Sequence, residues 1–280
     1  MKQGEISEGQ FTCAMTLTRE GSENIPERYI LPPLQRPNQT VIEHPLISLP
    51  VVNHGIPISV MQDALDVAKE FFHLPSDEKM QFASANVHEP VREKMGTYAK
   101  AVHILQKQLM GIVLENLGLD ANYLHDDIEA GSQVMAVNCY PPCPEPDLAL
   151  GMPPHSDYGT ITILNQNQQG LEIMDHDNRW HPVPFIQGAL IVQLGDQVEL
   201  LSNGRHKSTI HRATVNMKSN RLSIASIHSM PIDKKVGPTP QLVDEQYPAA
   251  YKEGSFREFL DYISANCLSE ARYIDTLKIL

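Results

Sequence analysis

The stretch from residue 134 to residue 227 decides the fold, because it is a run of short segments with the composition of β strands. Valine, isoleucine and threonine dominate these segments, and glycine, proline and asparagine separate them, as is typical of strands joined by turns. Many short strands predict a sandwich or a barrel. The segments are VMAVNCY (134–140), GTITIL (159–164), GLEIMD (170–175), ALIVQL (189–194), STIHRATV (208–215) and RLSIASI (221–227).

Helical patterns flank the β-rich stretch on both sides. ISVMQDALDVAKEFF (58–72) and residues 93–118 carry apolar side chains at three- and four-residue spacings, and Gly118 is placed as a stop signal. Helical spacing returns in residues 251–268. Helices, then strands, then helices predict an α+β protein with a mainly β core rather than alternating βαβ units. One structural unit is expected, with an N-terminal arm and helical region (1–130), a β core (131–240) and a C-terminal helical segment (241–280).

The first 45 residues are polar and punctuated by prolines, and they show no sustained period. Two interpretations remain open for them: an extended arm that lies on the domain, or a disordered tail.

Composition and charge narrow the classes of function. A chain of 280 residues with 41% hydrophobic and 20% charged residues can bury a large core. A formal charge of −12 argues against nucleic acid or an anionic membrane as partner and favours a small-molecule substrate. The four cysteines are too few for a disulfide framework, and no segment resembles a signal peptide or a membrane span. We expect a cytoplasmic protein, most simply a monomer.

The sequence contains two His-x-Asp motifs, which matter because two histidines and one carboxylate bind iron(II) and leave three adjacent positions open. His125-Asp126-Asp127 lies in a polar stretch and is interpreted as a surface charge cluster. His155-Ser156-Asp157 lies between a Pro-Pro turn and the strand GTITIL, where alternation places positions 155 and 157 on the same side. The expected metal ligands are therefore His155, Asp157 and, from the later strand STIHRATV, His211.

An arginine follows the third expected ligand by ten positions. A dicarboxylic keto acid that chelates the metal through one end leaves a second carboxylate inside the barrel, where it needs a partner. Arg221 offers a planar fork for that carboxylate, and Ser223 lies on the same face of its strand. Asn138 and Tyr140, which also share a strand face, supply neutral donors. These four residues are the predicted cosubstrate-binding group.

Four stretches resemble the signature blocks of plant 2-oxoglutarate/Fe(II)-dependent dioxygenases of specialised and hormone metabolism: NCYPPCPEPDL, GMPPHSDYGTITIL, LSNGRHKSTIHRATVN and NRLSIAS. The three expected ligands match the iron ligands of that family, Arg221 and Ser223 match its Arg-x-Ser pair, and Asn138 and Tyr140 match its Asn-x-Tyr motif. VVNHGIP (51–57) and AKEFFHLPSDEKM (68–80) match its N-terminal region.

The resemblance implies a fold, a reaction and a set of cofactors. The fold would be a double-stranded β-helix of the jelly-roll or cupin kind, with helices outside and the metal at the barrel mouth. The cofactors would be Fe(II), 2-oxoglutarate and O2, with ascorbate as reductant. The reaction would hydroxylate or desaturate a small plant metabolite of the flavonoid, hormone or indole type and release succinate and CO2.

The chain also departs from the family pattern in two places. QRPNQTVIEHPLISL (35–49) and FASANVHEP (82–90) stand where similar proteins carry longer segments, so the chain looks internally shortened. Cys139 replaces the usual aromatic residue in the middle of the Asn-x-Tyr motif and is expected to face away from the metal. Two alternatives stay open: a catalytically impaired chain that binds only iron and 2-oxoglutarate, and a non-enzymatic metal-binding cupin.

Overall fold

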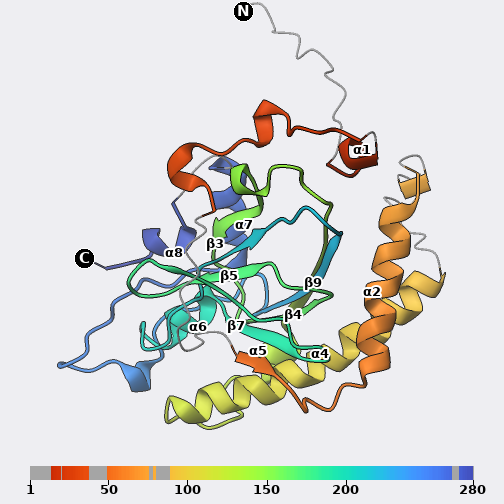
Figure 1. Cartoon of the computed structure of the whole chain (residues 1–280). Coiled ribbons are helices and arrows are strands. Elements are labelled where there is room, and N and C mark those ends of the chain that lie inside the picture. The colour runs from red at the N-terminus through yellow and green to blue at the C-terminus, as the bar shows by residue number, and fades with distance from the viewer. Residues whose placement is uncertain are drawn as a thin grey trace, which may run out of the picture.

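The computed structural model describes residues 14–19, 21–37, 49–75, 78–79, 89–266 and 271–279 (Figure 1). Two antiparallel sheets form the core of this part of the chain. The first sheet has the order β1 (Leu49–Val51), β7 (Leu190–Leu194), β4 (Ile161–Gln166), β9 (Arg221–Ser229) and β2 (Ser132–Tyr140). The second has the order β3 (Leu150–His155), β8 (His211–Thr214), β5 (Leu171–Met174) and β6 (Trp180–Pro182).

From β2 onwards, the chain alternates between the two sheets. Strands β2, β4, β7 and β9 belong to the first sheet, and the strands between them belong to the second. Buried apolar side chains from β4, β5 and β7, including Leu164, Ile173 and Ile191, form one cluster that joins the two sheets. This winding between facing sheets is the double-stranded β-helix, so the predicted fold is confirmed.

Two long helices, α2 (Ile58–His73) and α4 (Glu89–Asn116), pack against each other and lie along one side of the sheets (Figure 1). Their apolar faces share a core with the first sheet, for example Leu65 and Val102 with Ile163. Beyond α4, Gly118 has a φ of +76°, a conformation in which glycine commonly stops a helix. Both predicted helices are therefore present, although α4 begins four residues earlier than the pattern indicated. No helix of the described residues is long and apolar enough to cross a bilayer.

Shorter helices complete the described fold. They are α1 (Ala14–Arg19), α5 (His125–Glu129), α6 (Asp196–Leu201), α7 (Phe256–Ala265), α8 (Tyr273–Thr276), and the 3-10 turns η1 (Glu27–Tyr29), η2 (Pro33–Gln35), η3 (Pro146–Leu148) and η4 (Pro240–Leu242). Ser255 caps α7 in a reciprocal capping box with Glu258. The arm before residue 38 lies against the core, since Leu31 N donates to Leu148 O at 2.8 Å. The junctions of both apparent internal deletions fall largely on residues 38–48 and 80–88, outside the described residues.

His228, on β9, is a buried histidine whose protonation should affect stability. Its side chain is 3% exposed, its Nε2 lies 3.1 Å from Ser226 Oγ, and its ring stacks on that of His103. Burial, with the neighbouring His103, lowers the pKa of His228 to about 4. The unfolded chain takes up this proton near pH 6.5 and the folded chain only near pH 4, so stability present above pH 6.5 is lost as the pH falls through that window.

We therefore expect His228→Gln to lose less stability than the unsubstituted chain between pH 7.5 and pH 4.5, by up to about 3 kcal/mol. Glutamine keeps a hydrogen-bonding side chain but does not titrate. Urea unfolding of the metal-free protein at both pH values measures the difference. The control is His176→Gln, because the His176 side chain is 86% exposed. Equal pH dependence in His228→Gln and the control would contradict the assignment.

Candidate metal and cosubstrate site

The structure brings the three expected metal ligands together. His155 ends β3 and His211 begins β8, and the two residues are direct partners across the second sheet. The Nε2 atoms of His155 and His211 lie 3.7 Å and 3.9 Å from Asp157 Oδ1. The ligand atoms of all three residues lie within 4.8 Å of one another. This arrangement of two histidines and one carboxylate suits a divalent ion such as Fe(II) and leaves further positions open.

Backbone carbonyls fix the orientation of both imidazole rings. Nδ1 of His155 lies 2.8 Å from Pro153 O, and Nδ1 of His211 lies 3.0 Å from Thr209 O. Each Nδ1 therefore carries the proton and donates it, which leaves the Nε2 lone pair for a metal. Burial lowers the pKa of His211, so this imidazole stays neutral, as a metal ligand must.

The position of Asp157 differs from the sequence-based argument. Asp157 lies in the loop after β3, not on a strand, so strand alternation does not place it beside His155. Thr162 Oγ1 donates to Asp157 Oδ2 at 2.5 Å, and Asp196 N donates to Asp157 O at 2.8 Å. These bonds leave Oδ1 facing both imidazoles. Thr162 is thus a supporting residue that the sequence argument did not identify.

Arg221 is a buried cation that lacks a carboxylate partner among the described residues. Its side chain is 2% exposed, and its Nη2 donates to Gln166 Oε1 at 2.8 Å. Its Nε atom has no hydrogen-bond partner in the described part of the chain. Burial lowers the pKa of Arg221, yet a guanidinium stays charged in proteins. A buried, charged donor of this kind fits an anionic ligand, as the keto-acid prediction requires.

One cavity of about 200 Å³ connects the metal-ligand group with Arg221. Asn138, Tyr140 and Ser223 line it, as the sequence predicted, and the register pairs Asn138 with Ser223 and Tyr140 with Arg221. The guanidinium carbon of Arg221 lies 5.3 Å from the centre of the Tyr140 ring. The volume lies below the roughly 300–1,000 Å³ of drug-sized ligand pockets, which suits a small dicarboxylate.

Gly170 leaves the space that the Arg221 side chain occupies. A Cβ atom at position 170 would lie 2.5 Å from Arg221 Cδ and 2.7 Å from Nε, and Gly170 has a φ of +150°. We expect Gly170→Ala to displace the guanidinium and weaken 2-oxoglutarate binding at least ten-fold, while Fe(II) affinity changes less than two-fold. Anaerobic titration calorimetry measures both affinities. Gly96→Ala is the control, because its added Cβ meets no atom within 4 Å.

Three further residues lie in or near the site. Tyr158, which follows the ligand Asp157, packs among the rings of Phe256, Phe259 and Tyr273 and does not line the cavity. Like Thr162, Gln166 and Gln193 belong to the site but are not marked by any motif or spacing in the sequence.

The remaining His-x-Asp motif lies apart from the cavity. His125 and Asp126 are exposed on α5, and Asp127 pairs with Lys234 at 2.9 Å. The interpretation of this motif as a surface cluster is therefore confirmed.

Gln193 Nε2 lines the cavity and lacks a hydrogen-bond partner among the described residues, so it is a further donor for a ligand there.

Comparisons with known proteins agree with this site. Residues 131–229 match the 2OG-Fe(II) oxygenase superfamily, and residues 49–110 match the family described as non-haem dioxygenase in morphine synthesis N-terminal. The chain is 40% identical to the chloroplastic 2-oxoglutarate-dependent dioxygenase 21 of Oryza sativa subsp. japonica, over 82% of this chain and 81% of that protein. It is 33% identical to flavonol synthase/flavanone 3-hydroxylase of Arabidopsis thaliana, over 75% and 76%.

A solved structure supports the same assignment. The crystal structure of JOX2 in complex with 2OG, Fe and JA superposes with a TM-score of 0.82 at 27% identity, covering 89% of this chain and 92% of that one. The fold, the clustered ligands and these relatives together identify the chain as a member of the plant 2-oxoglutarate- and Fe(II)-dependent dioxygenases.

Proposed function

We propose that this chain oxygenates a small organic plant metabolite of the flavonoid, hormone or indole type, by hydroxylation or desaturation, with release of succinate and CO2. His155, Asp157 and His211 would hold Fe(II). Arg221 and Ser223, with Asn138 and Tyr140, would hold 2-oxoglutarate. This proposal rests on the buried Nε of Arg221, which has no hydrogen-bond partner among the described residues and lies in the cavity that also contains the metal-ligand group. O2 is the second cosubstrate and ascorbate the reductant in the same proposal.

Bound Fe(II) and 2-oxoglutarate would supply the oxygen activation, and the side chains of this protein position them. The carbonyls of Pro153 and Thr209 orient the two imidazoles, and Thr162 orients the carboxylate. Arg221 neutralises the far carboxylate of the keto acid. Apolar side chains that line the same cavity, such as Leu164 and Leu171, would keep water from the reacting region.

The substrate class rests on the relatives and on the size of the cavity. Relatives carry the names flavanone 3-dioxygenase 3 and flavonol synthase 1, and the JOX2 crystal contains JA. A cavity of about 200 Å³ that already holds a dicarboxylate has little room for a second organic molecule. The metabolite would therefore approach from outside the cavity, next to His155, whose side chain is 37% exposed.

The alternative is an impaired enzyme that binds iron and 2-oxoglutarate but positions the substrate poorly. Its support is the length of the alignment with Protein DMR6-LIKE OXYGENASE 1 of Arabidopsis thaliana. That alignment spans 330 positions, whereas 92% of this 280-residue chain is about 258 residues, so roughly 70 positions (330 − 258) have no residue here. A shortened chain would lack part of the wall around its substrate.

The coupling between 2-oxoglutarate use and product formation distinguishes the active oxygenase from the impaired enzyme. Purified protein is screened against flavonoids, hormone precursors and indoles for succinate release, and the ratio of oxygenated product to succinate is measured for the best substrate. We expect a ratio well below one, because an oxidant that is not shielded and has no well-placed C–H bond is wasted. A family-like insert between Pro90 and Glu93 should raise the ratio. A ratio near one would exclude the impaired version. If none of the compounds in the screen caused succinate release, the proposed function would be contradicted.

A further inference from the structure

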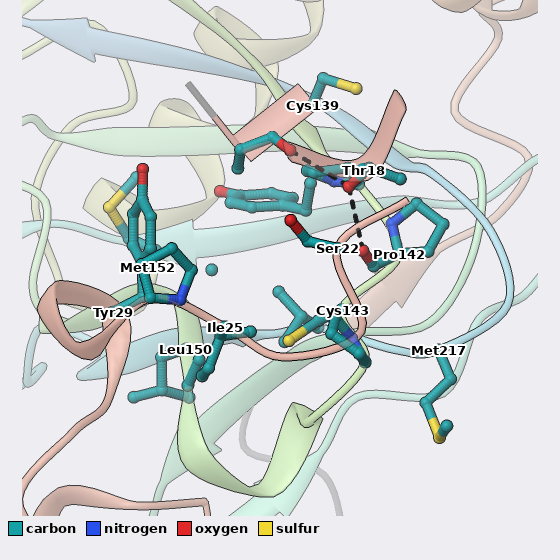
Figure 2. Close-up of a pocket in the computed structure, with 18 of the residues that line it drawn as sticks. Thr18, Ser22, Ile25, Tyr29, Cys139, Pro142, Cys143, Leu150, Met152 and Met217 are labelled. Atoms are coloured by element: carbon teal, nitrogen blue, oxygen red, sulfur yellow. Dashed lines mark hydrogen bonds between the residues drawn. The ribbon is translucent and has the colours of Figure 1, made fainter. Parts of the chain in front are cut away.

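A second and larger cavity, of about 490 Å³, lies between the N-terminal arm and the β core (Figure 2). We call it the arm cavity. Arm residues from α1 to Tyr29 form one side, and the end of β2, the start of β3 and Met217 form the other. Its volume falls within the roughly 300–1,000 Å³ of pockets for drug-sized molecules.

The arm is fixed to the core on both sides of this cavity. Thr18 Oγ1 donates to Pro142 O at 3.2 Å (Figure 2), and Ile25 N donates to Glu145 Oε2 at 3.0 Å. Cys139 Sγ also lies 3.8 Å from Met15 Sδ, so the side chain of Cys139 points to the arm. These contacts make the arm cavity a defined part of the fold.

The lining of the arm cavity indicates the chemistry of its ligand. None of the described residues that line it is charged. Ile25, Leu150 and Met217 offer apolar surface, and Ser22 and Tyr29 offer hydroxyl groups. An ion bound there would find no counter-charge among these lining residues, whereas a neutral molecule with one or two polar groups would be satisfied. Methionine side chains adapt readily to ligands of different shape.

Tyr140 forms a wall between the arm cavity and the cosubstrate cavity. Asn138, Tyr140 and Met152 line both cavities, whereas no metal-ligating side chain lines the arm cavity. The Tyr140 ring lies directly over Gly151, since a Cβ atom there would be 2.5 Å from it, and Arg221 lies on the ring. The two cavities therefore meet at the seam where β2 and β3, the edge strands of different sheets, are not hydrogen-bonded to each other.

We infer that the arm cavity is a second binding site for a neutral, mainly apolar small molecule, and that its occupation tightens 2-oxoglutarate binding through Tyr140. The molecule is not oxidised there, because Asn138 and Tyr140 of the predicted cosubstrate-binding group, and none of the metal ligands, border this cavity. A ligand against the Tyr140 ring restricts its motion and excludes water beside Arg221, which strengthens the pairing of the guanidinium with a carboxylate. The binding site stands without the proposed function, whereas the coupling rests on it.

Nile red, a neutral apolar dye, tests the site in the full-length, metal-free protein. We expect saturable one-to-one binding with increased fluorescence. Ser22→Trp, which fills the cavity from the arm, and Met217→Glu, which places a charge at its rim, should each weaken the dye at least ten-fold. Glu23→Trp and Lys218→Glu are matched controls at neighbouring exposed positions outside the lining, and should stay within two-fold. Unchanged affinity in both cavity variants would overturn the site.

The coupling is measured under anaerobic conditions with Fe(II) present. Saturating Nile red should lower the dissociation constant of 2-oxoglutarate about five-fold, and 2-oxoglutarate should tighten the dye by the same factor, since linkage is reciprocal. Ser22→Trp should remove the effect of the dye. Dye binding without any change in 2-oxoglutarate affinity would overturn the coupling. Failure of 2-oxoglutarate to bind at all would overturn the coupling together with the proposed function, while the dye affinities would still decide the site.

Discussion

Replacing His211 with alanine is expected to abolish the visible charge-transfer absorption that Fe(II) and 2-oxoglutarate give together in the anaerobic protein. His211 is 8% exposed, its ring centre lies 4.2 Å from that of His155, and its Nε2 lies 3.9 Å from Asp157 Oδ1. Without it, two side chains remain, and one of them is on the exposed side of the site. A bidentate keto acid needs a metal fixed by three ligands with adjacent open positions.

The matched control is His125→Ala, which removes the histidine of the other His-x-Asp motif. His125 is exposed on α5, so the band should keep its full intensity. Circular dichroism and the unfolding transition of the metal-free protein show whether each variant is folded. A full band in folded His211→Ala would mean that the distal ligand is misassigned. Loss of the band in folded His125→Ala would mean that the metal binds at the His125 motif and that His155 and Asp157 are misassigned.

Much of this fold could be predicted because its strands and helices have strong local patterns. The β-branched segment that became β4 is buried along its whole length, and α2 buries Met61, Ala64 and Leu65 at helical spacing. In contrast, the pair Pro153-Pro154 predicts a turn but lies within β3. This strand is an edge strand with a single partner, β8, so Pro153 and Pro154 need no second hydrogen bond.

The site could be predicted only as far as its residues are marked by spacing along the chain. The two histidines and Arg221 were found in that way. Gln166 was not, because it reaches Arg221 through the pairing of β4 with β9, where Gln166 lies opposite Ser223. Sequence spacing carries no information about strand order. The arm cavity depends likewise on how residues far apart in the chain meet, as Thr18 meets Pro142.

Replacing Arg221 with lysine is expected to weaken 2-oxoglutarate binding roughly ten- to a hundred-fold while Fe(II) affinity stays nearly unchanged. Lysine keeps the charge but loses the planar fork. In this structure Nη2 of Arg221 is already engaged with Gln166, and Nε is the donor without a partner among the described residues. A single ammonium group cannot serve Gln166 and a carboxylate with the same geometry. Losing one buried, charged hydrogen bond costs on the order of 1.5–3 kcal/mol, which gives the stated range.

Arg212→Lys is the control, because it makes the same change at another buried arginine beside the same cavity. Arg212 is 3% exposed, but its Nε donates to Glu172 Oε2 at 2.7 Å and its guanidinium lies 4.2 Å from the centre of the Trp180 ring. Its charge is therefore already paired with a carboxylate, unlike that of Arg221, although Arg212 Nη2 also has no hydrogen-bond partner among the described residues. Anaerobic calorimetry should show 2-oxoglutarate affinity within two-fold of the unsubstituted protein for Arg212→Lys. An equal loss in both variants would point to general disturbance of the core, and no loss in Arg221→Lys would rule out Arg221 as the group that holds the far carboxylate.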